Sequence, residues 1–137
     1  MSYWLVKSEP NAWSWEQHVA AGVEPWDGVR NHQACNNMKA MKRGDRALFY
    51  HSGAERQVVG VLEVVREYYP DPSDASGRFG MVDFKALHPL ARPVSLAEIK
   101  ADGRLDHIAL IRQSRLSVLP LDDGAWRMIA EMGGIAP

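Results

Sequence analysis

Apolar residues recur along part of this chain at the spacing of two that is typical of β-strands. Val82, Phe84 and Ala86 alternate with Asp83 and Lys85, so one face of this segment is apolar and the other is polar. Runs of aromatic and β-branched residues between turn signals predict four further strands, over residues 3–7, 47–50, 57–68 and 117–121. The near-continuous Val and Leu content of 57–68 predicts burial on both faces of that strand.

Helices are predicted where a capping residue precedes apolar residues at helical spacing. Ser14 with Gln17 and Ser95 with Glu98 have the spacing of capping boxes. The predicted helices begin after Ser14 (ending at Gly22), Asn31 (ending at Gly44-Asp45), Ser95 (ending at Asp102) and Asp122 (reaching Met132), with one further turn over residues 107–111. In the second helix the apolar residues Ala34, Met38 and Met41 share one face.

Five or six strands in mixed order, with short helices between them, predict an α+β fold. The chain lacks the regular alternation of strand and helix that a doubly wound parallel sheet requires. We expect a small, strongly bent sheet or barrel, with the helices near Gln17, Ala34 and Arg127 packed on its outside. The length of 137 residues suits a single domain over residues 1–137.

The net charge of −1 and the single cysteine restrict the function classes. A protein that grips long nucleic acid through many phosphates is usually basic, so a nucleic-acid contact here should involve few phosphates. Cys35 alone can form neither an internal disulfide nor a Cys-rich zinc site. The sequence has no apolar run long enough for a membrane span and no N-terminal signal, which predicts a cytoplasmic protein, or a nuclear one in a eukaryote.

The segment from Trp26 to Asn37 carries a dense set of planar polar groups. It holds one indole, a guanidinium, three Asn amides, a Gln amide and an imidazole. An indole can stack on a flat heterocycle while amides and backbone groups read its edge. The alternative is a turn and a helix with Trp26 in the core, where Trp is usually buried. Burial of the amides would require a partner for each, so the segment favours a recognition site.

No catalytic, metal or cofactor site is predicted. Cys35 and His32 stand at helical i,i+3 spacing, but no third group is placed to orient them as a catalytic pair. The five His are scattered singly, without the spacing of metal ligands. No Gly-rich loop resembles a phosphate cradle.

Short polar clusters follow or precede the predicted strands. They are Lys7-Ser8-Glu9, Tyr50-His51-Ser52 and the run from Arg112 to Arg115. The run from Arg112 to Arg115 could supply phosphate contacts. Each cluster alone would be expected to face solvent, and Arg115 could simply pair with a surface acid. Together with the Trp26 segment, the three clusters predict the rim of one convergent pocket.

Seven blocks of the sequence resemble the EVE domain, in its order and approximate spacing. They are residues 3–10 (YWLVKSEP), 26–31 (WDGVRN), 36–37 (NN), 49–52 (FYHS), 59–61 (VGV), 92–96 (RPVSL) and 115–118 (RLSV). The resemblance covers nearly the whole chain and implies a PUA-like mixed β pseudobarrel with short helices packed around it. It also implies non-catalytic binding of a modified base in DNA or RNA through an aromatic-lined pocket. We expect a monomer without a membrane partner.

The YTH domain, a more distant relative that binds methylated adenine, suggests individual roles. By that analogy Trp26 is one wall of an aromatic cage, Glu9 and the backbone of Asp27 meet the base edge, and Lys7 approaches the phosphate. The loop over residues 70–77 has no Trp to form a second wall, and Cys35 stands where a basic residue is expected. The expected ligand-binding residues are Lys7, Ser8, Glu9, Trp26, Asp27, Arg30, Asn31, Tyr50, His51, Ser52, Arg115 and Ser117.

Two alternatives from other classes stay open on the sequence. The first is a small hydrolase acting on nucleic acid in the same pocket, with Lys7, Glu9 or His51 in acid–base roles. The second is a protein-interaction module in which Trp26 anchors the interface, and it requires a large exposed apolar patch.

Overall fold

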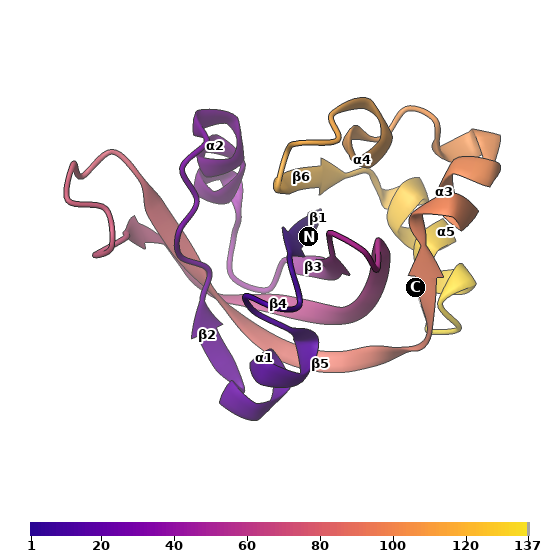
Figure 1. Ribbon diagram of the computed structural model, residues 1–137, viewed down its shortest axis with the longest axis horizontal. Helices are drawn as coiled ribbons and strands as arrows, with labels where there is room; N and C mark the ends of the chain where they lie inside the picture. The colour runs from indigo at the N-terminus through magenta and orange to yellow at the C-terminus, as the bar shows by residue number, and fades with distance from the viewer. Residues whose placement is uncertain (137) are drawn as a thin grey trace.

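One bent, mixed sheet organises the computed structural model, which describes residues 1–136 (Figure 1). Its strands are β1 (Tyr3–Ser8), β2 (Val23–Pro25), β3 (Arg46–His51), β4 (Gln57–Pro70), β5 (Gly80–Ser95) and β6 (Val118–Leu121). The helices are α1 (Trp15–Ala21), α2 (His32–Ala40), α3 (Leu96–Ala101), α4 (Ala109–Arg112) and α5 (Asp123–Met132), with a 3-10 turn η1 (Gly103–Leu105). None of these helices is long and apolar enough to cross a membrane. The predicted α+β class is confirmed.

β1 and β3 form the parallel pair of the sheet. The strand order is β2-β5-β4-β3-β1-β6, and the other neighbouring strands pair antiparallel. In the parallel register Lys7 stands opposite Tyr50, and Ser8 stands opposite His51. Because the two strands run in the same direction, the polar clusters at their ends leave the same edge of the sheet.

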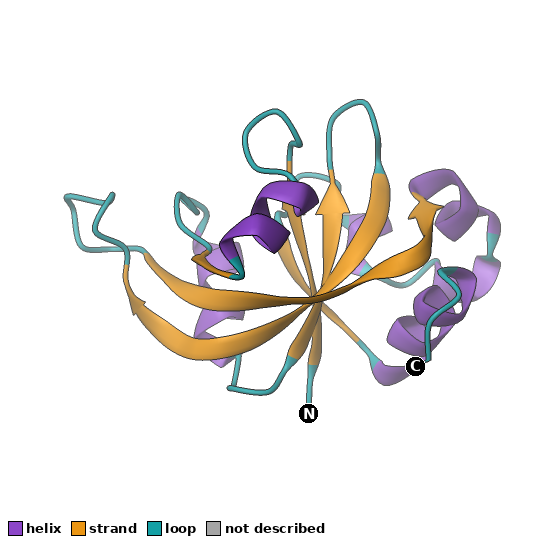
Figure 2. Ribbon diagram, turned by 90° about the horizontal axis from the view of Figure 1, so that it is seen from below, coloured by secondary structure: helices purple, strands orange, loops and turns teal. Residues whose placement is uncertain are grey.

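Irregular pairing bends the sheet into its curved form. The β3–β4 ladder changes register between Phe49 and Tyr50, and the β4–β5 ladder changes register at four places along its length. Such bulges kink a strand and increase its local twist. The long strands β4 and β5 therefore sweep in an arc across the molecule, with helices on either side (Figure 2).

α2 closes the gap between the two ends of the bent sheet. It packs against β6 on one side and against β4 and β5 on the other. Ala34, Met38 and Met41, the apolar face predicted from the sequence, are fully buried. The side-chain amide of Asn37 donates to the Val118 carbonyl oxygen at 2.8 Å, which satisfies part of the β6 backbone. Helix α2 thus closes the pseudobarrel between β6 and the strands β4 and β5, which do not pair with β6.

The centre of the core is an aromatic cluster around Phe49. Trp15, His18 and Trp26 all meet the Phe49 ring edge-on, with ring centroids 5.7, 5.9 and 5.4 Å away. Edge-to-face pairs at this distance add stability beyond their buried area. The Trp15 ring fits against Gly60 on β4, so closely that a Cβ on Gly60 would stand 2.5 Å from it.

Most predicted elements are confirmed, including both capping boxes and the Asp122 cap of α5. The predicted end of the second helix at Gly44-Asp45 is wrong: α2 ends at Ala40, because Met41 turns to extended backbone. Burial of 57–68 on both faces is also wrong. Val59 and Val65 are half-buried and Arg66 is exposed, because only one face of β4 meets the core along its whole length. β2 was not predicted, because three residues are too few to show alternation of apolar and polar positions.

We expect Gly60→Ala to lower the free energy of unfolding by about 1–3 kcal/mol, because the added methyl overpacks the site under Trp15. Urea denaturation measures the loss. Gly103→Ala is the matched control, since its Cβ would meet nothing closer than 3.9 Å. Equal stability of the two variants would contradict the close packing of Trp15 on β4.

Candidate functional site

A cavity of about 270 Å³ opens where the bend after β1 meets the segment between β2 and α2. We call it the indole cavity. It is lined by Lys7, Ser8, Ala12, Trp13, Glu24, Pro25, Trp26 and Asp27. Pairing of β2 with β5 brings Glu24 and Pro25 to the cavity, and β1 brings Lys7 and Ser8. Four lining residues, Lys7, Ser8, Trp26 and Asp27, were expected from the sequence.

Two tryptophans line this cavity. Trp26 is only 7% exposed, and its ring meets Phe49 and Phe84 edge-on, so it belongs to the core as well as to the cavity. Trp13 is half-buried, and its indole N–H donates to Nδ1 of His18 at 3.0 Å. The Ser8 hydroxyl donates to the Trp13 carbonyl at 2.8 Å and fixes the backbone of the same bend. The cavity therefore has two aromatic groups on separately anchored segments.

His18 holds Trp13 to the sheet. Its imidazole is fully buried, and Nε2 lies 2.8 Å from the carbonyl oxygen of Phe84 on β5. An indole N–H can only donate, so Nδ1 of His18 must accept and the proton must be on Nε2. Burial lowers the pKa of His18, although the Phe84 hydrogen bond and nearby Glu24 partly oppose this. The neutral imidazole is the form that fits both partners.

Carboxylates and one ammonium supply the polar groups of the indole cavity. Neither Glu24 nor Asp27 takes part in a side-chain hydrogen bond or ion pair with any residue from 1 to 136. The Lys7 ammonium donates to the Ser114 carbonyl at 3.0 Å and lies 5.8 Å from the centre of the Tyr50 ring. Burial lowers the pKa of Lys7. The carboxylates thus remain available to a donor on a ligand.

Several other expected residues line neighbouring cavities. Tyr50 and Ser52 belong to a second cavity, which shares Lys7 with the indole cavity. Asn31 and Arg115 line a third recess of about 340 Å³. The Asn31 side chain also accepts from the Ala34 N–H at 2.9 Å, as the predicted cap of α2.

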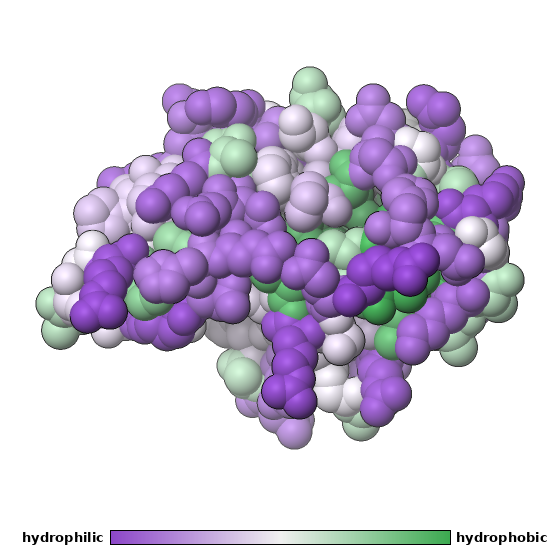
Figure 3. Space-filling model, turned by 90° about the horizontal axis from the view of Figure 1, so that it is seen from above, coloured by the Kyte–Doolittle hydropathy of each residue, from purple (hydrophilic) through white to green (hydrophobic). Residues whose placement is uncertain are grey.

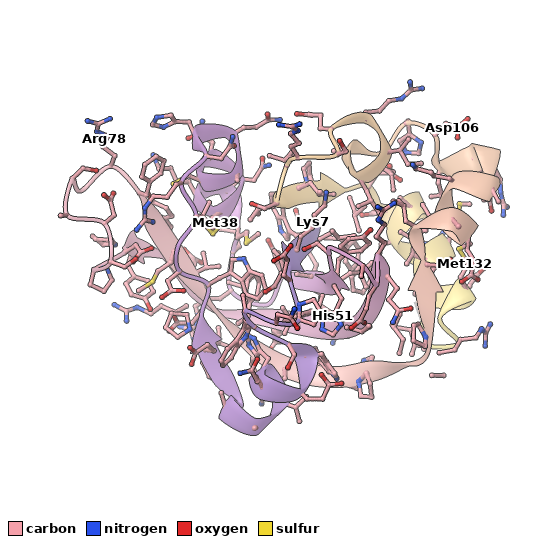
Figure 4. The ribbon with its side chains drawn as sticks, in the orientation of Figure 1. Lys7, Met38, His51, Arg78, Asp106 and Met132 are labelled. Atoms are coloured by element: carbon pink, nitrogen blue, oxygen red, sulfur yellow. The ribbon has the colours of Figure 1, made fainter. Side chains whose placement is uncertain are left out.

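Glu9, His51 and Ser117 lie outside the indole cavity. The buried His51 accepts the Trp15 N–H on Nε2 at 3.0 Å, and its Nδ1 lies 2.9 Å from Glu55. It is 4% exposed and is the last residue of β3 (Figure 4). Glu9 is exposed beside Gly53, and the backbone carbonyl of Ser117 accepts the Lys7 N–H at 2.9 Å.

Arg30 secures the segment that carries Trp26. Its guanidinium donates to the buried Asp71 at 3.2 Å and to Ser73 at 2.9 Å, and the Gly28 N–H donates to Asp71 at 2.8 Å. Burial alone would raise the pKa of Asp71, but these hydrogen bonds and those from Ser73 lower it to about 2. Arg30 therefore acts here as an anchor between the Trp26 segment and the loop before β5.

The sequence did not predict Trp13 and Glu24 as site residues. Trp13 follows Pro10 by three residues, within the bend after the Lys7-Ser8 strand end, so its position was the available signal. Glu24 lies on the short β2, which itself gave no signal. Cys35 and His32 each contact a different residue. Cys35 Sγ lies 3.2 Å from the Tyr68 hydroxyl, and the His32 ring packs on Phe79. No cluster of three or more potential metal ligands occurs in residues 1–136.

Comparison with known proteins gives consistent matches over the whole chain. The sequence pattern of the EVE domain matches residues 2–132. Thymocyte nuclear protein 1 of Rattus norvegicus is 33% identical over 175 residues, which cover 99% of this chain and 75% of the rat protein. The NMR structure of Rpa0253 from Rhodopseudomonas palustris is 54% identical with a TM-score of 0.92, covering 98% of this chain and 94% of that one. The human THYN1 protein, in complex with 5-methylcytosine-containing DNA, is 30% identical with a TM-score of 0.90 and 100% coverage of both chains.

We expect acid to destabilise the protein through His18. Its folded pKa lies below the ordinary 6.5, so the unfolded chain takes up this proton first as the pH falls. Stability should therefore fall below about pH 6.5, by at most about 1.4 kcal/mol per pH unit, until the folded pKa is passed. Urea midpoints between pH 8 and pH 5 measure the slope. It should be shallower in His18→Gln and unchanged in His88→Gln, which alters an exposed histidine. Parallel curves for wild type and His18→Gln would contradict this assignment.

Proposed function

This chain belongs to the EVE domain family, and from that premise we propose that its indole cavity binds one modified nucleobase of DNA or RNA without chemical conversion. The THYN1 complex with 5-methylcytosine-containing DNA supports a modified base in DNA as the ligand. We assign residues 1–137 to a single EVE domain, since the family match spans 2–132.

The observation that carries the proposal is the pair of indoles on one small cavity. A volume of about 270 Å³ is just below the range of about 300–1,000 Å³ typical of drug-sized ligands, and it suits a single flat heterocycle. Stacking of a base on an aromatic side chain contributes about 1–3 kcal/mol. Trp13 and Trp26 provide such surfaces, with the polar atoms of Ser8 and Asp27 beside them.

The carboxylates favour a base that presents an amino group at its edge. Cytosine offers an N4 amino donor, which Asp or Glu accepts, whereas thymine offers an O4 acceptor at the same position. A carboxylate facing O4 would place two hydrogen-bond acceptors against each other, without a donor between them. Glu24 and Asp27, which have no protein donor of their own among residues 1–136, therefore favour a methylated cytosine over thymine.

The ligand must leave its stack to reach the cavity. Extruding a base from a duplex costs a few kcal/mol, so an unpaired or weakened base should bind more tightly. The net charge of −1 limits the contribution of phosphate contacts. Affinity should therefore come mainly from the base itself.

The hydrolase alternative is less well supported than base binding. His51, its best acid–base candidate, accepts a backbone N–H on one nitrogen and contacts Glu55 with the other. The interaction module is also less well supported. Within residues 1–136 the exposed large apolar side chains are Met1, Val19 and Val23, while Trp26 is 7% exposed. On the face seen in Figure 3 the strongly hydrophobic residues lie in recesses between hydrophilic ones.

We expect Trp13→Ala to weaken binding of 5-methyl-2′-deoxycytidine by roughly five- to hundredfold, the loss of one stacked base. Because Trp13 is only half-buried, the melting temperature should fall modestly. Tyr3→Ala is the control, since Tyr3 stacks on Trp126 at the opposite end of β1. Calorimetric titration and thermal melting measure both quantities. Wild-type affinity in Trp13→Ala would refute its role as a stacking wall.

We expect Trp26→Ala to lose stability as well as affinity. Its ring packs on Phe49 and Phe84, so truncation should cost about 3–5 kcal/mol of unfolding free energy. Trp26→Phe keeps an aromatic surface and should fold, with an affinity between those of wild type and Trp13→Ala. A stable Trp26→Ala protein would show that Trp26 is not part of the core.

We expect the double variant Glu24→Gln/Asp27→Asn to lose its preference for 5-methyl-2′-deoxycytidine over thymidine. The two ligands share the 5-methyl group, whereas the amino donor of one is an oxygen acceptor in the other. An amide can donate to that oxygen, so the affinity ratio should change by about 5- to 150-fold. Titration of both nucleosides against both proteins measures the ratio, and an unchanged ratio would exclude the carboxylates from base readout.

A further inference from the structure

A second cavity of about 250 Å³ lies beside the indole cavity and shares Lys7 with it. We call it the basic cavity. Its polar lining comprises Lys7, Tyr50, Ser52, Arg56, Lys100 and Ser114. These residues come from the ends of β1 and β3, the turn between β3 and β4, helix α3 and the segment before β6. Parallel pairing of β1 with β3 places the two strand ends together, and α3 completes the wall.

The charge of this cavity is opposite to that of its neighbour. Three cationic side chains, Lys7, Arg56 and Lys100, line it, and its lining contains no carboxylate. Two acids lie close to it: the Glu9 carboxylate approaches Gly53 at the rim, and Glu55 lines an adjoining recess with Arg56 and Lys100. The indole cavity, in contrast, has two carboxylates and shares only the Lys7 cation. A ligand spanning both cavities would place its amino edge in one and its negative charge in the other.

The cations of the basic cavity are not neutralised by protein acids. None of the three forms an ion pair with a residue between 1 and 136. The guanidinium of Arg56 donates to the Gly53 carbonyl, and Lys7 donates to the Ser114 carbonyl. Each group keeps further N–H donors for an anion, because Arg has five and Lys has three. Burial already makes the charged form of Lys7 costly, and a bound anion would stabilise it.

The backbone at Arg56 is consistent with a specific position for this side chain. Arg56 has a φ of +50°, the only positive φ of a non-glycine residue within 1–136. Such a conformation costs free energy and persists where surrounding contacts fix it. Here the Arg56 carbonyl accepts the Leu96 N–H at 2.8 Å, which ties the turn before β4 to α3.

We propose that the basic cavity binds a phosphate group, that of the nucleotide adjacent to the base held in the indole cavity. This inference rests on the proposed function and adds to it a second subsite, for a phosphate beside the bound base. Lys7, Arg56 and Lys100 supply charge, and the hydroxyls of Tyr50 and Ser52 supply further donors. The same chemistry would accept a free phosphate ion, so the test must separate the two sources.

Four probes separate the base from the phosphate. They are 5-methyl-2′-deoxycytidine, a single-stranded hexamer with one central 5-methylcytosine, the same hexamer with uncharged methylphosphonate linkages on both sides of that base, and inorganic phosphate. Each is titrated into wild type, Arg56→Gln/Lys100→Gln and Arg43→Gln. Arg43 is the matched control, because it is an exposed arginine just before the opposite end of β3.

We expect the hexamer to bind Arg56→Gln/Lys100→Gln at least about tenfold more weakly than wild type, the usual loss for charge-assisted hydrogen bonds. The nucleoside should bind both proteins within twofold, and Arg43→Gln should match wild type. Methylphosphonates should weaken binding to wild type by a similar factor and abolish the difference between the two proteins. If the double variant fails to fold, the methylphosphonate comparison on wild type alone decides.

Other results overturn the inference in distinguishable ways. Equal hexamer affinity for wild type and double variant would exclude the basic cavity from nucleic-acid binding. An equal loss in Arg43→Gln would mean general electrostatic attraction. Inorganic phosphate that binds wild type as tightly as the hexamer does would mean a free-anion site. Absence of nucleoside and hexamer binding would instead refute the proposed function, whatever inorganic phosphate does.

Discussion

The neutral imidazole of His18 connects the candidate site to the sheet. On one side it donates to the Phe84 carbonyl of β5, and on the other it accepts the indole N–H of Trp13. Its ring also packs edge-on against Phe49, the centre of the aromatic core. No charged or aliphatic side chain could be donor, acceptor and aromatic neighbour together. The position of one cavity wall therefore depends on a single proton remaining on Nε2.

Parallel pairing of β1 and β3 divides the site into parts of different charge. It brings Lys7 next to Tyr50 at one edge of the sheet, so the Lys7 ammonium lies between the two cavities. Carboxylates on the β2 side suit hydrogen-bond donors, and cations on the α3 side suit anions. A nucleotide has these two features on one molecule, an amino-bearing edge and a phosphate. The net charge of the chain is thus close to zero, although negative side chains gather at one cavity and positive side chains at the other.

Local signals allowed most of the fold to be predicted, whereas the site depended on contacts between distant residues. The Ser14–Gln17 and Ser95–Glu98 capping boxes are complete within four residues, so the sequence alone showed them. The role of Trp13 depends on His18, which is in turn fixed by Phe84, 66 residues further along. His51 was expected at the pocket rim, but the Trp15 N–H, 36 residues away, holds it inside. The sequence predicted polar clusters at the strand ends. Tertiary contacts decide whether each of these side chains faces a cavity or the protein interior.

Trp26 belongs to both the core and the cavity, and this has consequences for recognition. Its edge contacts with Phe49 and Phe84 fix the ring before any ligand arrives, so little conformational entropy remains to be lost on binding. Trp13, held mainly by one hydrogen bond and the Ser8 contact, is the more adjustable wall. One rigid wall and one adjustable wall suit a flat base. In the proposed function, the cavity edge with Glu24 and Asp27 then distinguishes a base with an amino group from one with an oxygen at the same position.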